Sequence, residues 1–339
     1  MRWRYGSTPI NIYPFFKEKG VNYHRLRIFV KDEGPDSLLY ATNTAKIVQN
    51  LGMQCSITLF LSSDWSDIGK QPVPEQWIRD YDWENCSLTQ KCNIIRNHTK
   101  NTTQFLLLNG IDAEVYEIGN EIDYGICGIF EENLVMRENS QWMENNTWDN
   151  MAELIKAGIE GVQAVDGTSR FILHIAHWWD VNFSSAFFQK MMNKEVPFDF
   201  IGLSFYPSSG IYNITKAYMG EGDGTLSQQL FFETTENLSQ RMGKQIIISE
   251  YAYPSSSVII GPFSSFTHMV EGYPLTKQGQ KEWLLDFLRW SNEQSFIAGT
   301  FYFSPEFYVF IWAPMSLFTY FGQAKPAIDA FNEFSSQQR

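Results

Sequence analysis

Seven short apolar runs, rich in β-branched and aromatic residues, recur along the chain with amphipathic segments between them. Apolar runs of this length bounded by polar turns are typical of buried strands. The segments 37–51, 148–165 and 277–291 have apolar residues at helical spacing, and such alternation of strand and helix predicts a parallel sheet, closed or open. The strands are predicted at His24–Val30, Met53–Phe60, Ala113–Ile118, Phe171–Ile175, Phe198–Ser204, Gln245–Ser249 and Ala298–Phe303.

Seven strands leave an eight-stranded barrel one strand short at its beginning. Pro14–Lys19 is predicted to be the first helix, so only Met1–Tyr5 remains for a strand ahead of it. We expect an α/β fold, a (β/α)8 TIM barrel whose first strand is missing or very short at the N-terminus. The 339 residues could also form two smaller domains, but no repeat or linker marks a boundary, which favours a single domain over 1–339.

Composition and charge narrow the partners. A formal net charge of −12, without any Lys/Arg run, argues against nucleic acid and anionic membranes as partners. Aromatic residues make up 16% of the chain, and beyond those in the core they are suited to line a sugar-binding cleft. The longest apolar stretch, residues 307–321, is too short to span a membrane and contains Pro314, so we predict a buried strand and turn there.

Cysteines and glycosylation acceptors favour an extracellular protein. Cys86 and Cys92 flank a short polar loop in which a disulfide would be easy to form, whereas Cys55 is predicted to be a buried thiol. No apolar signal segment follows Met1, so we expect any secretion signal to lie outside this sequence. Acceptor triplets occur at Asn85, Asn97, Asn101, Asn145, Asn182, Asn213 and Asn237.

Two glutamates occupy matching positions at the ends of apolar runs. Glu121 closes Glu-Val-Tyr-Glu-Ile-Gly-Asn-Glu, and Glu250 closes Gln-Ile-Ile-Ile-Ser-Glu. The carboxyl ends of barrel strands are where active sites form, and two carboxylates across a glycosidic bond are what a glycosidase needs. Asn120 fits a contact to a sugar 2-hydroxyl. The alternative for each acid is a capped or ion-paired loop, for Glu250 with Arg25 or Arg27.

Other polar residues could support this pair. Arg25 and Arg27 share one face of their strand and either point inward to carboxylates or lie at the surface. Tyr206, at the end of another run, could donate a hydrogen bond to the nucleophile or simply pack. His174 and His177 have a spacing that could suit a metal, but no third ligand is evident, and a hydrogen-bonded His174 is the preferred interpretation. Neither a nucleophile elbow nor a phosphate-binding glycine loop is present.

The order of these motifs resembles glycoside hydrolase family 53, the arabinogalactan endo-β-1,4-galactanases, a family of retaining (β/α)8 barrels. The resemblance implies Glu121 as acid/base and Glu250 as nucleophile, and it implies that the chain starts after the first strand. Asn120, Arg25, Arg27, His174 and Tyr206 would surround the cleaved bond, and Asp64, Trp65 and Phe303 would bind substrate. The matching motifs are Phe15–Asn22, Arg25-Leu-Arg27, Asp64-Trp65-Ser-Asp67, Ile118-Gly-Asn-Glu121, His174, Phe198–Pro207, Ser249–Tyr253 and Tyr302–Pro305.

The departures from the family pattern concern sugar binding. Leu61-Ser62 replaces a His-Tyr pair, Ser208-Ser209 stands where a Trp is usual, and Phe303-Ser304 replaces Trp-Glu. Some members bind calcium after the seventh strand, but residues 255–273 offer only Glu271, so no metal or other cofactor is expected.

These observations leave three hypotheses open. The first is a monomeric, secreted, retaining endo-glycosidase that hydrolyses β-1,4-galactan by double displacement. The second keeps the mechanism but takes a β-glucan, β-mannan or arabinoside. The third is a carbohydrate-binding pseudoenzyme without catalysis.

Overall fold

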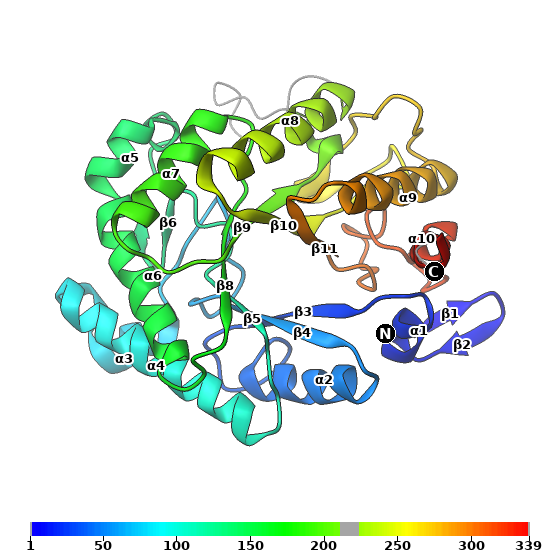
Figure 1. Cartoon of the computed structure of the whole chain (residues 1–339). Helices are drawn as coiled ribbons and strands as arrows, with labels where there is room; N and C mark the ends of the chain where they lie inside the picture. Colours follow the sequence, from blue (N-terminus) through cyan, green and yellow to red (C-terminus); the bar gives the residue numbers. More distant parts are fainter. Residues whose placement is uncertain (1, 211–223, 338–339) are drawn as a thin grey trace. The chain divides into compact units, whose positions relative to one another are not determined.

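The computed structural model describes residues 2–210 and 224–337 (Figure 1). Its main sheet has seven strands in the order β3-β4-β5-β8-β9-β10-β11, which follows the chain, and the pairs from β3 to β9 are parallel. All seven predicted strands are therefore present, within a few residues of the predicted bounds. They are β3 (Tyr23–Ile28), β4 (Gln54–Leu59), β5 (Val115–Ile118), β8 (Arg170–Ile175), β9 (Phe200–Phe205), β10 (Gln245–Tyr251) and β11 (Ile297–Tyr302).

Helices connect consecutive strands, as expected for βαβ units. The four helices predicted from the sequence are present as α1, α2, α6 and α9. The helices are α1 (Ile12–Glu18), α2 (Leu38–Asn50), α3 (Glu75–Tyr81), α4 (Leu88–Leu108), α5 (Ser140–Asn146), α6 (Trp148–Gln163), α7 (Val181–Asn193), α8 (Gly224–Met242), α9 (Lys277–Glu293) and α10 (Asp329–Gln337).

Local sequence explains where several helices begin. Ser87 and Gln90 form a capping box at the start of α4, and the Asp180 carboxylate caps α7. The close packing of α4 on α6 depends on Gly161, because a Cβ there would lie 2.1 Å from the Thr99 hydroxyl oxygen. The Thr99 hydroxyl in turn donates to the Gly158 carbonyl at 2.8 Å.

Contacts divide the chain into two compact units. One consists of residues 23–203 and 238–247, and the other of residues 1–22, 204–237 and 248–339. Of the four boundaries, one falls inside β9 and one inside β10, so the division does not separate two sheets. The single domain stays a prediction.

The candidate first strand does not join the main sheet. Trp3–Tyr5 forms β1, which pairs antiparallel with β2 (Thr8–Ile10) in a separate two-stranded sheet. The backbone of Arg4 bonds instead to Gly322 and Ala324, near the other end of the chain. Lys19 and Tyr5 both bond to the carboxylate of Asp329, and Lys19 lies 2.6 Å from it.

Two further predictions are wrong. No strand forms within residues 307–321, since the segment turns repeatedly around Pro314. The predicted burial holds for Trp312, Met315, Leu317 and Phe318 but not for Phe310 and Phe321, which are 61% and 86% exposed. Cys86 and Cys92 are both free thiols. Cys86 ends a 3-10 turn and contacts the Tyr81 carbonyl, whereas Cys92 faces the Glu153 carbonyl from inside α4.

The predicted burial of Cys55 is confirmed. Among the described residues, no helix is both long enough and apolar enough to cross a membrane.

Candidate active site

The Glu121 side chain comes from a tight turn just after β5. The backbone of Glu121 is left-handed, with φ of +46°, and the residue is 8% exposed. Three hydrogen bonds fix this turn. The Ile122 N–H donates to the His174 carbonyl at 2.9 Å, and the Gln71 amide donates to the carbonyls of Asn120 and Glu121 at 2.9 and 3.1 Å. A non-glycine residue in this conformation is costly and persists because its surroundings hold it.

Asn120 is fully buried, and both ends of its amide are bonded. The Arg25 guanidinium donates to its Oδ1 at 2.8 Å, and its Nδ2 donates to the Ser66 carbonyl at 3.0 Å. The Asn120 side chain therefore has one fixed orientation beside Glu121.

A buried carboxylate that sequence reasoning missed, Glu117 in β5, is central to this group. Arg25 lies 2.5 Å from its Oε1, and the His174 Nδ1 lies 3.0 Å from the same oxygen. Burial alone would raise the pKa of Glu117, but the charges of Arg25 and His174 outweigh it and lower the pKa to about 2. Glu117 is ionised at neutral pH and holds Arg25 toward Asn120.

The other residues predicted on this side form a second group. Arg27 points the same way as Arg25, lies 3.6 Å from the Asp36 carboxylate, and has its guanidinium 5.6 Å from the centre of the Trp65 ring. Trp65 donates to Asp67 at 2.8 Å. Asp64 is exposed and lies 3.3 Å from Lys70. Arg25 and Arg27 thus each pair with a carboxylate, that of Glu117 and that of Asp36 respectively.

Asp123, also missed from the sequence, ties the Glu121 turn to the end of β8. Its carboxylate accepts the N–H groups of Ala176, at 2.9 and 3.0 Å, and of His177, at 2.5 Å. Burial raises the pKa of Asp123 to about 6, although these N–H groups oppose the rise. Asp123 thereby fixes the residues on both sides of the acid turn.

His177 belongs to a different group from His174. Its Nδ1 lies 3.0 Å from the Tyr124 hydroxyl, and its ring stacks on Phe183 at a centroid distance of 4.0 Å. Among the residues that the structure describes, no cluster of three potential metal ligands occurs.

Glu250 lies in the other compact unit and has a different environment. Strand β10 continues through Glu250 to Tyr251, past the predicted end at Ser249. Glu250 is 2% exposed. The Tyr206 hydroxyl donates to its Oε2 at 2.9 Å, as one of the two interpretations of Tyr206 predicted. Three aromatic rings surround Tyr206 at centroid distances of 5.6 to 6.5 Å, namely Phe266, Trp312 and Phe303.

Comparison with protein families decides the chain's membership. The model of glycosyl hydrolase family 53 matches residues 7–331, nearly the whole chain. The chain belongs to glycosyl hydrolase family 53. It is therefore a glycoside hydrolase, as the order of motifs predicted.

Relatives and solved structures of family 53 agree with this assignment. Arabinogalactan endo-β-1,4-galactanase A of Emericella nidulans is 27% identical over 276 residues, which cover 78% of this chain and 68% of the relative. The enzyme of the same name from Aspergillus niger is 28% identical over 275 residues, with the same shares covered.

Two family 53 structures share the fold. A GH53 catalytic domain from Ignisphaera aggregans has a TM-score of 0.79 at 22% identity, covering 98% of this chain and 91% of its own. A fungal β-1,4-galactanase structure has a TM-score of 0.78 at 20% identity, covering 98% and 94%. Together with the seven-stranded sheet, these matches confirm the predicted (β/α)8 TIM-barrel class.

Proposed function

We propose that this family 53 member is a retaining endo-β-1,4-galactanase, with Glu250 as nucleophile and Glu121 as acid/base. The observation that carries the assignment is the buried Glu250 carboxylate near the end of β10, which accepts a hydrogen bond from the Tyr206 phenol. The named activity of the fungal relatives supports galactan as the substrate.

In the first step, a Glu250 oxygen attacks the anomeric carbon while Glu121 gives its proton to the leaving oxygen, so a glycosyl ester replaces the glycosidic bond. The Tyr206 hydroxyl donates to Oε2 of Glu250 at 2.9 Å, and this hydrogen bond orients the carboxylate and stabilises its charge before the bond to carbon forms.

In the second step, Glu121 takes a proton from water, and this water releases the sugar with its original anomeric configuration. Asn120, with its amide fixed by Arg25 and the Ser66 carbonyl, would bond the sugar 2-hydroxyl at the transition state.

The two glutamates can be told apart with an aryl β-galactoside whose leaving group needs no proton. Glu121→Ala should still form the ester rapidly but hydrolyse it slowly, whereas Glu250→Gln should lose nearly all turnover. A 2-fluoro-galactoside should label Glu250, and a label on any other residue would sink the assignment. If the first product detected by NMR has the inverted configuration, the retaining mechanism is wrong.

The second candidate substrate is a β-mannan, a β-glucan or an arabinoside, and the small side chains at positions expected to bind sugar are the observation behind it. Leu61 and Ser62 are buried, and Ser208 is buried with its hydroxyl unbonded, where family members usually have larger rings. Initial rates on matched oligosaccharides of β-galactan, β-mannan and β-glucan, with an arabinoside, decide between the classes. Galactan should be turned over fastest, and a faster rate on any other glycan would replace it as the substrate.

We also propose that the enzyme works outside the cell as a monomer. All six acceptor asparagines within the described residues are exposed, and Asn213 lies outside the described residues. Production through a eukaryotic secretory pathway should give a glycoprotein whose mass falls on treatment with peptide-N-glycosidase. An unchanged mass would remove this support.

A further inference from the structure

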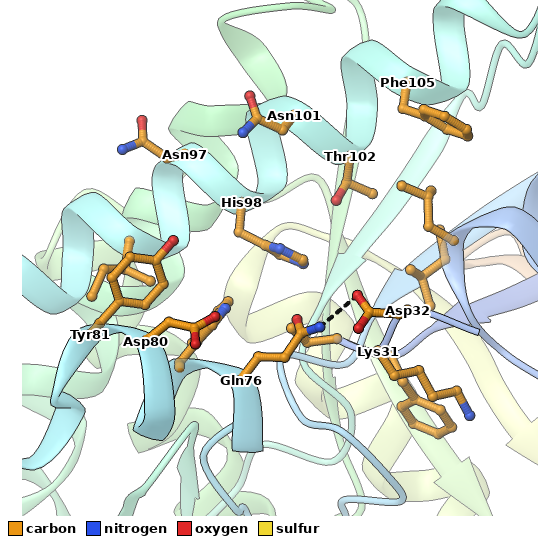
Figure 2. Close-up of a pocket in the computed structure, with 16 residues that line it drawn as sticks. Lys31, Asp32, Gln76, Asp80, Tyr81, Asn97, His98, Asn101, Thr102 and Phe105 are labelled. Atoms are coloured by element: carbon orange, nitrogen blue, oxygen red, sulfur yellow. Dashed lines mark hydrogen bonds between the residues drawn. The ribbon is translucent and has the colours of Figure 1, made fainter. Parts of the chain in front are cut away.

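A pocket of about 420 Å³, whose lining includes none of the residues proposed for catalysis, lies within the unit formed by residues 23–203 and 238–247 (Figure 2). Its walls come from three places: the end of β3 with the loop after it, helix α3, and helix α4. A volume of several hundred Å³ is ordinary for a small-ligand site. This one is large enough for one or two sugar rings.

The lining combines flat aromatic rings with neutral polar groups. Tyr81 on α3 is 52% exposed and Phe105 on α4 is 36% exposed, so both present open ring surface. Gln76 donates to Asp32 at 2.7 Å, and the exposed amides of Asn97 and Asn101 border the pocket from α4. Sugars present apolar C–H faces and hydroxyl edges, which aromatic rings and amide or carboxylate groups match.

His98 is the polar group that points toward a ligand. Its ring extends from α4 into the space that Gln76 and Asp32 border on the other side (Figure 2). It packs edge-on against Trp77 at 5.2 Å, and it makes no hydrogen bond with any residue that the structure describes. Burial lowers the pKa of His98 to about 4, so at neutral pH its ring offers one donor and one acceptor, as a hydroxyl requires.

The charges around the pocket disfavour an anionic ligand. Asp32 and Asp80 line it together with one cation, Lys31, whose ammonium lies over the Phe29 ring at 5.0 Å. Asp80 forms an ion pair with Arg79, which compensates its negative charge. A neutral, hydroxyl-rich ligand fits this lining better than a phosphate or a sulfated chain does.

We propose that this pocket is an accessory site for a neutral glycan, separate from the catalytic residues. The glycan could come from a polysaccharide chain in solution or from an N-linked glycan attached at Asn97 or Asn101 on the rim. The proposal rests on the chain being a glycoside hydrolase and not on galactan being its substrate.

Affinity electrophoresis tests the polysaccharide source. The full chain carrying Glu250→Gln, made in a bacterial host that adds no N-glycans, is run through native gels containing β-1,4-galactan, β-mannan or β-glucan. Adding Tyr81→Ala should weaken binding to at least one of them about tenfold. Adding Tyr40→Ala instead, which removes a tyrosine on α2 that is 47% exposed and does not line the pocket, should change nothing.

A second variant guards against a trivial effect of Tyr81 on stability. His98→Ala should weaken the same binding by several fold, while His98→Gln, which keeps a donor and an acceptor, should weaken it less. Both pocket variants, made without Glu250→Gln, should cleave short soluble oligosaccharides at the rate of the parent enzyme.

The attached source is tested with enzyme from a eukaryotic host. If a glycan at Asn97 or Asn101 fills the pocket, polysaccharide binding should be weak until Asn97→Gln and Asn101→Gln are introduced, and this result supports the proposal. If neither Tyr81→Ala nor His98→Ala changes the binding of any of the three polysaccharides, with protein from either host, the accessory-site proposal is overturned. Failure to cleave galactan would overturn the proposed substrate and leave these gel results standing.

Discussion

The two proposed catalytic glutamates have opposite surroundings. Glu121 lies on a turn held by polar groups, with Asn120, Arg25 and Glu117 in one bonded chain behind it. Glu250 lies inside a strand, its carboxylate accepts a hydrogen bond from the Tyr206 phenol, and aromatic rings pack around that phenol. The turn needs many hydrogen bonds because its backbone is strained, whereas a strand already fixes the backbone of Glu250.

This difference predicts different failures. Substitutions on the Glu121 side should destabilise the fold, because the polar groups there are buried and removing one of them leaves the charge of its partner unpaired. Damage on the Glu250 side should slow the reaction while the fold remains, because the aromatic rings can lose one hydroxyl without losing their packing.

The largest effect on stability is expected from Glu117→Gln. It leaves the buried Arg25 guanidinium without its carboxylate, which should lower the free energy of unfolding by about 3–5 kcal/mol in urea denaturation. The matched control is Glu114→Gln, just ahead of the same strand, whose pairing with Arg170 is about half exposed and should be worth about 1 kcal/mol or less.

The pH dependence of this effect has a definite sign. The pKa of Glu117 is lowered from 4.5 to about 2, so its stabilisation is present above about pH 4.5 and is lost as the pH falls toward 2. The difference in Tm between the parent and Glu117→Gln should therefore narrow with falling pH. A difference that stays constant from pH 6 to pH 3 would contradict the ionised state of Glu117.

Tyr206→Phe should reduce kcat by about 10- to 100-fold, because a hydrogen bond to a charged group contributes about 1.5–3 kcal/mol. The thermal midpoint should change little, since the ring and its neighbours remain. Tyr253→Phe provides the control: it removes a buried hydroxyl that donates to the Tyr273 carbonyl, and should lower Tm without lowering kcat. Equal losses of kcat in the two variants would show that Tyr206 has no special role.

Asp123→Asn should cost about 1–3 kcal/mol of stability, because its amide can no longer accept both backbone N–H groups well. The pKa of Asp123 is raised from 3.8 to about 6 in the folded protein, so folding favours the protonated carboxyl. The stability that the parent gains from this protonation is fully present below pH 3.8 and is lost as the pH rises through about 6. The Tm difference from the parent should narrow with rising pH, opposite to Glu117→Gln. A widening difference would mean that the backbone N–H groups outweigh burial.

The smallest effect is expected from Trp312→Phe, on the ring 6.3 Å from Tyr206. Loss of one aromatic contact is worth about 0.5–1.5 kcal/mol, so kcat/KM on galactan should fall by less than about tenfold. Trp290→Phe, in the stacked pair with Phe232, is the control and should leave kcat/KM unchanged. A loss above a hundredfold for Trp312→Phe would make the aromatic rings as important as Tyr206.

The sequence predicted the seven strands well because apolar runs and turn residues are local signals. Arg25, Asn120 and His174 were also predicted, by their positions at strand faces and strand ends, and the structure brings them together around Glu117. The Tyr206 bond to Glu250 followed from the same reasoning.

The rest depended on contacts that local patterns do not encode. Glu117 stands in the middle of an apolar run, and its partner Arg25 is 92 residues away in the chain. To predict this pair, one would need to know that β4 lies between β3 and β5 and in which register it pairs with each, because that register puts Arg25 and Glu117 on the same face of the sheet. The Cys86–Cys92 bridge failed for a related reason, because Cys92 lies inside α4 and faces α6 rather than the loop.

Hydrogen bonds join the first and last described segments of the chain. Arg4 bonds to residues 322–324, and Tyr5 and Lys19 both bond to Asp329. This means that the order of the segments along the polypeptide is separable from the fold. A short linker between the ends and a new opening at the exposed loop Glu33–Gly34 would give a circular permutant with every strand still paired. In that molecule β3 would be synthesised last, so the protein could be assembled from a different starting strand.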